Sequence, residues 1–202
     1  MKPGCVPERR VTLATANPDK ARELAALLEG FDVVSRPPDL ADVEETADTL
    51  EGNARLKAEA VMRATGELAV ADDTGLEVDA LGGRPGVYAA RYAGPGATYA
   101  DNVAKLLDEL AGVPVGQRRA RFRTVAVAVF GDGRTLVAEG AVEGAIVDGP
   151  RGKGGFGYDS VFVPTGGDGR TFAEMTQAEK AAVSHRGRAL RSLAAQLLRT
   201  LP

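Results

Sequence analysis

The sequence predicts an α/β protein with a mixed, twisted central sheet and flanking helices, organised as a single domain over residues 1–202. A β-branched segment at 10–15 is followed by a helical pattern at 18–28, as in a strand–helix unit. Two alternating segments at 118–130 and 135–147 predict a long antiparallel hairpin. Because no internal repeat or low-complexity linker interrupts the chain, no second independent domain is expected.

The composition excludes several classes of function. A hydrophobic content of 44%, a charged content of 26% and a net charge of −3 are typical of a globular protein and argue against binding to a nucleic acid polymer. No apolar run reaches the roughly 18 residues that span a membrane. Residues 1–10 lack the apolar core of a signal peptide, and the lone Cys5 permits no intrachain disulfide. We therefore expect a cytoplasmic protein.

The first loop has the pattern of a phosphate site. Asn17 is a good helix cap, Pro18 suits the first helical position, and Lys20 follows in the first turn. The backbone N–H groups of a helix N-terminus and a nearby ammonium group both attract phosphate. The alternative is an ordinary capped helix with a lysine in solvent.

An acidic loop at 39–49 precedes the second predicted helix, Leu50–Thr65, which Gly66 should end. Asn53 and Lys57 lie four residues apart and so share one face of that helix. Such a pair is usually solvated. A helix followed by a strand can nevertheless bring Lys57 to the acids of the next segment.

The apolar run Leu68–Ala71 is predicted to be a strand that ends at the adjacent acids Asp72 and Asp73. Thr74 and Gly75 are then expected to turn the chain. A rigid strand that delivers carboxylates at its tip is a common way to hold a divalent metal. The alternative is a strand followed by an ordinary acidic turn.

The middle of the chain is predicted to be structural. Thr98 and Asp101 form a capping-box pattern at the start of an amphipathic helix over 98–110. The second segment of the hairpin, 135–147, is expected to be another strand or a pair of strands broken by Gly140 and Gly144.

A glycine-rich stretch at 148–164 holds Phe156 before a short predicted strand, Ser160–Val163. Glycines let the backbone approach a ligand closely, and an exposed aromatic ring offers a face for a planar base. The alternative is a loop whose aromatic side chain packs into the core.

The C-terminal region carries a second group of cations. Thr176 and Glu179 form a capping box that opens a short helix containing Lys180. His185 and Arg186 follow between two helices, either as structure or as a pair of donors to a carbonyl oxygen. A single histidine rules out a histidine metal cluster. The last helix is expected to bury four leucines: Leu190, Leu193, Leu197 and Leu198.

Taken together, these patterns predict a Mg²⁺-dependent enzyme that acts on a nucleotide. The acids would hold the metal, the cations would hold phosphates, and the loop aromatic could stack on a base. The acids are Glu44, Asp72 and Asp73, and the cations are Lys20, Lys57, Lys180 and Arg186.

The order of motifs closely resembles that of the inosine triphosphate pyrophosphatase family, over nearly the whole chain. The motifs are T-x-N-x-x-K at 15–20, E-E-T with E-x-N-A-x-x-K-A at 44–58, A-D-D-T-G-L at 71–76, G-x-P-G-V-Y-x-A-R-Y at 83–92, G-x-G-G-F-G-Y-D at 152–159 and E-K with S-H-R-G at 179–187. Ala16, Thr74 and Ser160 depart from the Gly, Ser and Pro that are frequent in the family.

The resemblance implies hydrolysis of non-standard purine nucleoside triphosphates (ITP, dITP and XTP) to the monophosphate and pyrophosphate. It further implies Mg²⁺, a homodimer, and a bilobed domain with its active site in the cleft between the lobes. Asp73 would be the proton acceptor with Lys57 beside it, and Glu44, Asp72 and Asp73 the metal-binding acids. The substrate would be bound by Thr15, Asn17, Lys20, Asn53, Thr74, Phe156, Gly157, Tyr158, Asp159, Lys180, His185 and Arg186.

Base selection follows from hydrogen-bond polarity. Hypoxanthine and xanthine present a 6-oxo acceptor and an N1–H donor, which match donors such as His185 and Arg186 and an acceptor such as Asp159. Adenine reverses both polarities. Two alternatives remain: a related septum-inhibition type of pyrophosphatase that prefers modified pyrimidines, and a non-catalytic nucleotide sensor on the same scaffold.

Overall fold

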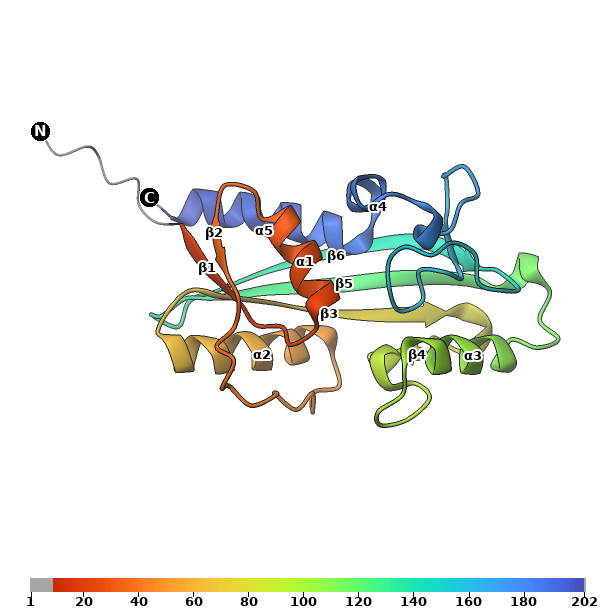
Figure 1. The fold of residues 1–202 in the computed structure, drawn as a ribbon, viewed down its shortest axis with the longest axis horizontal. Helices are drawn as coiled ribbons and strands as arrows, with labels where there is room; N and C mark the ends of the chain where they lie inside the picture. The colour runs from red at the N-terminus through yellow and green to blue at the C-terminus, as the bar shows by residue number, and fades with distance from the viewer. Residues whose placement is uncertain (1–8, 202) are drawn as a thin grey trace, which may run out of the picture. The chain divides into compact units, whose positions relative to one another are not determined.

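The computed structural model describes residues 9–201, so Cys5 lies outside the described part. The strands are β1 (Arg10–Leu13), β2 (Asp32–Val34), β3 (Ala69–Val78), β4 (Pro85–Gly86), β5 (Arg119–Val129), β6 (Thr135–Ile146) and β7 (Phe162–Pro164). The helices are α1 (Pro18–Leu27), α2 (Leu50–Thr65), α3 (Tyr99–Glu109), α4 (Gln177–Val183) and α5 (His185–Thr200). Strand order is β2-β1-β3-β5-β6-β7, with β4 paired to β3, which makes the sheet mixed as predicted (Figure 1).

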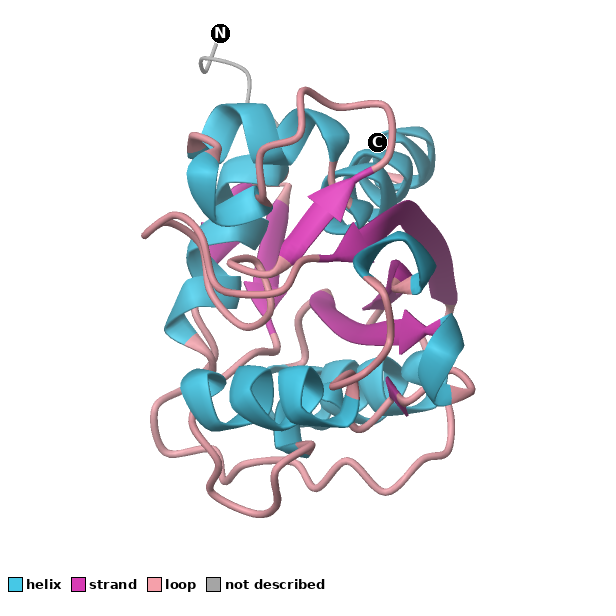
Figure 2. Ribbon diagram, turned by 90° about the vertical axis from the view of Figure 1, so that its right-hand side faces the viewer, coloured by secondary structure: helices cyan, strands magenta, loops and turns pink. Residues whose placement is uncertain are grey.

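The described chain divides into two compact units, and strands β3, β5 and β6 each contribute residues to both. Unit 1 comprises 9–73, 125–139 and 189–201, and unit 2 comprises 74–124 and 140–188. Each unit combines helices with strands. Figure 2 shows the helices of the described chain in cyan and its strands in magenta. Within residues 9–201, none of the helices has the length and apolar character needed to cross a membrane.

Unit 1 is built on parallel pairing around β1. Its residues lie opposite β2 on one side and β3 on the other, with Leu13 aligned to Val70. Helices α1 and α5 cover one face of these strands and α2 covers the opposite face (Figure 1). The core on the α1–α5 face contains Leu24 and Leu193, both fully buried, because their helices place leucines at helical spacing toward the sheet.

Strand β3 contradicts one prediction. The strand does not end at the two acids, and Thr74 and Gly75 do not turn the chain, because β3 continues from Ala69 to Val78. The strand that ends here is β1, whose pairing with β3 stops at Val70. The acids therefore lie just beyond the end of a neighbouring strand. Lys20 and Lys57 compensate the two buried carboxylates, so the negative charge does not interrupt β3.

Unit 2 has an aromatic core. Phe162 and Phe172 are fully buried and lie with their ring centroids 5.2 Å apart, and Phe122 packs on Phe162 edge to face at 4.7 Å. Leu106 of α3 and Leu110, which caps the C-terminus of that helix, also belong to this core. The capping box predicted at the start of α3 is confirmed, with both reciprocal hydrogen bonds present.

Element boundaries show where local signals suffice. Helix α2 has the predicted bounds, and Gly66 ends it in the left-handed conformation at φ 70°. The short strand β2 was not predicted. Strand β6 runs unbroken through Gly144. Glycine at this position is explained by packing, because a Cβ there would overlap the ring of Phe162. The prediction that Leu198 is buried is wrong, since it is 43% exposed. Strand β7 begins two residues later than predicted, at Phe162.

Candidate functional site

The loop between β1 and α1 forms the predicted cap. The Asn17 side-chain oxygen accepts hydrogen bonds from the backbone N–H groups of Asp19 at 2.9 Å and Lys20 at 3.3 Å. Thr15 accepts from the Asn17 N–H at 3.1 Å. The Lys20 ammonium lies 3.6 Å from Asp72, which is 1% exposed. The loop therefore places a cation and a helix N-terminus beside the acids of β3.

Asp73 is the centre of a second polar group in unit 1. The Lys57 ammonium lies 3.0 Å from Asp73 and 2.9 Å from Glu45, so it bridges β3 and the acidic loop. The Asn53 amide donates to Asp73 at 3.4 Å, and its oxygen accepts from the Ala47 N–H at 2.9 Å. Asn53 is fully buried, so its visible role is to attach the acidic loop to Asp73.

Burial and neighbouring charges shift the pKa values of Asp73 and Lys57 in opposite directions. Burial raises the pKa of Asp73 above its ordinary value, and Lys57 and Lys20 only partly offset that effect. For Lys57, burial lowers the pKa, but the attraction of Asp73 and of Glu45 outweighs it, so the pKa is raised. Lys57 is thus held as a cation, beside a carboxylate more basic than a free aspartate.

Successive residues of a strand point to opposite faces of a sheet, so Asp72 and Asp73 do not act as one paired carboxylate. Their contacts follow this alternation: Asp72 contacts Lys20 from α1, and Asp73 contacts Lys57 from α2. Glu44 is exposed at the side chain, whereas its neighbour Glu45 contacts Lys57. Glu45 is therefore a cluster residue that sequence reasoning missed. Its spacing twelve residues before Lys57 gave no helical or strand signal.

Unit 2 contains a buried ion pair. The Lys180 ammonium lies 2.6 Å from Asp159, and their side chains are 6% and 5% exposed. Asp159 also accepts the Phe156 N–H at 2.8 Å. Gly155 has a positive φ of 67°, and a Cβ at this position would overlap the Asp159 carboxylate. One glycine of the predicted loop is thus required by the close approach of an acid, as well as by its backbone conformation.

The two loop aromatics have different surroundings. Phe156 is partly exposed, with the Lys180 ammonium 4.8 Å and the Arg186 guanidinium 5.3 Å from its ring centroid. Tyr158 is 5% exposed, and its hydroxyl donates to the Ala89 carbonyl at 2.9 Å. Burial also raises the pKa of Tyr158. Phe156 is therefore the more exposed of the two residues and contacts cations, whereas Tyr158 packs in the core.

His185 and Arg186 lie in the first turn of α5 and are both 2% exposed. The His185 ring stacks on Phe122 at 4.5 Å with an interplanar angle of 14°. Arg186 donates to the Thr74 hydroxyl at 3.1 Å, and Thr74 lies 2.6 Å from the Thr124 hydroxyl. Phe122 and Thr124 were not singled out from the sequence, although the alternation of β5 places both on one face.

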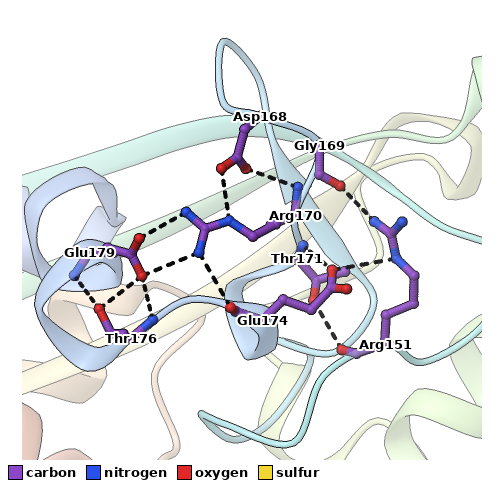
Figure 3. Close-up of polar contacts among 8 residues, drawn as sticks. All are labelled: Arg151, Asp168, Gly169, Arg170, Thr171, Glu174, Thr176 and Glu179. Carbon is purple, nitrogen blue, oxygen red and sulfur yellow. Dashed lines mark hydrogen bonds and ion pairs between the residues drawn. The ribbon is translucent and has the colours of Figure 1, made fainter.

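A network of charged groups ties the start of α4 to the preceding loop (Figure 3). Arg170 contacts Asp168 at 2.7 Å and Glu179 at 2.8 Å. Arg151 donates to the Gly169 carbonyl at 2.8 Å. Hydrogen bonding to Arg170 is the main reason that the pKa of Glu179 falls to about 2. The network anchors the residue that immediately precedes Lys180.

The structure thus groups the predicted site residues into two clusters, one within each unit. The unit 1 cluster has carboxylates, lysines and a helix N-terminus, which suit phosphates and cations. The unit 2 cluster has buried cations around the ring of a partly exposed phenylalanine, which suits a planar polar group. The predicted members in unit 1 are Thr15, Asn17, Lys20, Asn53, Lys57, Asp72 and Asp73, and those in unit 2 are Thr74, Phe156, Asp159, Lys180, His185 and Arg186.

An α/β protein with these two clusters has the side chains typical of a protein that binds a phosphorylated, planar ligand. The Ham1 family profile matches residues 11–196, and the chain belongs to this family. A dITP/XTP pyrophosphatase from Symbiobacterium thermophilum is 47% identical over 197 residues, covering 96% of each chain. The dITP/XTP pyrophosphatase from Nitratidesulfovibrio vulgaris is 52% identical over 193 residues, covering 91% of this chain and 93% of its own.

The fold has solved counterparts. The structure of the Staphylococcus aureus Ham1 protein superposes with a TM-score of 0.82 at 38% identity, covering 95% of this chain and 99% of that one. The predicted fold class, a mixed central sheet with flanking helices, is therefore confirmed. The predicted family relationship is confirmed by the same comparisons.

Proposed function

We propose that this protein hydrolyses non-standard purine nucleoside triphosphates, namely dITP, XTP and ITP, to the nucleoside monophosphate and pyrophosphate. The observation that carries the proposal is the buried Asp73–Lys57 contact at 3.0 Å, in a chain about half identical to dITP/XTP pyrophosphatases along nearly its whole length. Water must attack the α-phosphorus, so the enzyme needs a proton acceptor and cations that offset the charge of the triphosphate.

Unit 1 supplies both requirements in this proposal. Asp73 accepts the proton of the attacking water, and its raised pKa favours that role. Lys57 positions the Asp73 carboxylate. Lys20, Thr15 and Asn17 bind phosphate oxygens at the N-terminus of α1, where the helix dipole and the Lys20 charge attract the same group.

The donor set also fits Mg²⁺. Within residues 9–201 no group of three or more His, Cys, Asp or Glu side chains is arranged to hold a metal ion. Mg²⁺, however, is usually held by one or two carboxylates together with substrate phosphates and water. We propose Asp73 and Glu44 as its carboxylate ligands, with Glu45 beside them. Asp72 is left out of this set because its side chain lies on the opposite face of β3, beside Lys20. When bound, the ion would neutralise phosphate charge.

Unit 2 supplies base selection. Lys180, His185 and Arg186 offer donors for a 6-oxo group, and the Asp159 carboxylate offers an acceptor for N1–H. Adenine would place a donor against donors, which leaves buried polar groups unsatisfied. In this proposal the ring of Phe156, a partly exposed residue, gives the planar base a stacking face.

A substrate panel tests the proposal. Purified protein with Mg²⁺ is offered ITP, XTP, ATP, dTTP and UTP, and pyrophosphate and orthophosphate are measured separately. We expect pyrophosphate from ITP and XTP only. Orthophosphate as the product, or a preference for the pyrimidines, would contradict the proposal. Asp73→Asn should lower kcat by about 10² to 10⁴, the usual contribution of a general base.

We also propose that the protein is a homodimer, as the family resemblance implies. Size-exclusion chromatography with light scattering should give about twice the chain mass of 21.0 kDa. A mass of one chain at micromolar concentration would refute this.

A further inference from the structure

Three side chains from three elements meet through hydroxyl groups within unit 2. Thr124 lies in β5 and is fully buried, Thr74 lies in β3, and Arg186 is the second residue of α5. The Thr74 and Thr124 oxygens are 2.6 Å apart, and the Arg186 guanidinium donates to Thr74 at 3.1 Å. Thr124 reaches Arg186 through the hydroxyl of Thr74.

The chemistry of these groups fixes part of the arrangement. A guanidinium has donors and no acceptor, so the Thr74 oxygen must accept from Arg186. A separation of 2.6 Å lies in the hydrogen-bond range for two hydroxyls. Whichever hydroxyl donates in that second bond, Thr124 keeps the Thr74 oxygen on the side that faces Arg186. A threonine side chain has three staggered χ1 rotamers. Without the Thr124 hydroxyl, Thr74 can rotate so that its methyl group, and not its oxygen, faces Arg186.

We propose that Thr124 is a positioning residue for purine recognition, acting through Thr74 on Arg186. The inference rests on the proposed function, because it assigns Arg186 to the base. Arg186 lies 5.3 Å from the Phe156 ring centroid, so its orientation fixes one boundary of the proposed base subsite. Thr124 itself contacts no substrate in this proposal.

Thr124→Val is the direct test. Valine has nearly the same shape but places a methyl group where the hydroxyl lies 2.6 Å from Thr74, so Thr74 must rotate. We expect KM for ITP to rise about tenfold with kcat within about twofold, because the lost bonds serve binding and not the reacting atoms. Thr124→Ser keeps the hydroxyl and should retain a KM within about twofold of wild type.

Thr12→Val is a matched control. Thr12 is 1% exposed in β1, its hydroxyl donates to Glu67 at 2.9 Å, and neither residue has a proposed role in the site. This variant also loses one buried hydroxyl hydrogen bond. It should lower the melting temperature by a similar amount and leave KM for ITP unchanged.

The outcomes separate the two claims. If wild-type protein hydrolyses neither ITP nor XTP, the proposed function fails. If wild type is active but Thr124→Val keeps its KM, or Thr124→Ser is as impaired as Thr124→Val, the positioning role is overturned. An equal rise of KM in Thr12→Val overturns it as well. If the valine variant does not fold, Thr124→Ala gives the same comparison without the added methyl.

Discussion

Replacing Lys180 with methionine probes the buried ion pair of unit 2. The Lys180 ammonium lies 2.6 Å from Asp159, and neither side chain is more than 6% exposed. Removing one partner of a buried pair generally costs about 3–5 kcal/mol, because the remaining charge loses its compensation. Asp159 keeps the hydrogen bond from the Phe156 N–H at 2.8 Å, so we expect the lower end, about 3 kcal/mol.

Urea unfolding and thermal melting measure this cost. A loss of about 3 kcal/mol should lower the melting temperature by about 6–12 °C in a chain of this length. The double variant Lys180→Met with Asp159→Asn should recover most of the loss, because the uncompensated charge is gone. Lys153→Met, at an exposed position of the same loop region, is the control and should change the free energy of unfolding by less than about 0.5 kcal/mol.

Two results would refute this reasoning. One is a loss below about 1 kcal/mol for Lys180→Met, which would mean that water replaces the ammonium at little cost. The other is a double variant no more stable than Lys180→Met alone. The destabilisation would then come from lost packing of the lysine side chain, and the charge of Asp159 would be irrelevant to it.

Three further predictions concern the rest of the site. Asn53→Ala should cost about 1–3 kcal/mol in urea unfolding and lower ITP turnover, because it detaches the acidic loop from Asp73; unchanged kinetics would contradict this. Arg170→Ala should lower the melting temperature slightly above pH 4.5, with the difference from wild type vanishing as pH falls toward 2. The pKa of Glu179 is lowered from 4.5 in the unfolded chain to about 2 in the folded one, so the stability that its pairing with Arg170 contributes is lost as the pH falls through that range. A difference in melting temperature between wild type and variant that does not change with pH would refute the pairing. Chelation by EDTA should abolish ITP hydrolysis and added Mg²⁺ should restore it; full activity in EDTA would exclude the metal.

Local signals predicted several elements correctly. The bounds of α2 follow from a cap at Thr49 and a left-handed Gly66, and the capping boxes at Thr98 and Thr176 both form. These signals act over three or four residues, so the sequence alone carries them. The spacing of Asn53 and Lys57 likewise placed both on the helix face that contacts β3.

Strand ends were not predictable in the same way. Asp72 and Asp73 have the composition of a turn, yet β3 passes through them because Lys20 and Lys57 compensate their charges after folding. Gly144 suggested a break in β6, but Phe162 from another strand fills the space that its missing side chain leaves. In each case the decisive partner is distant in sequence.

The sequence by itself determined the family and the helix caps, and it indicated most of the polar residues that form the two clusters, because these depend on residue type and short spacing. Tertiary structure alone decided which polar groups meet: Glu45 with Lys57, and Thr124 with Thr74. It also separated Asp72 from Asp73, which the sequence presents as a pair. The physical reason is that strand alternation directs neighbouring side chains to opposite faces, whereas pairing of distant strands and helices selects the partner on each face.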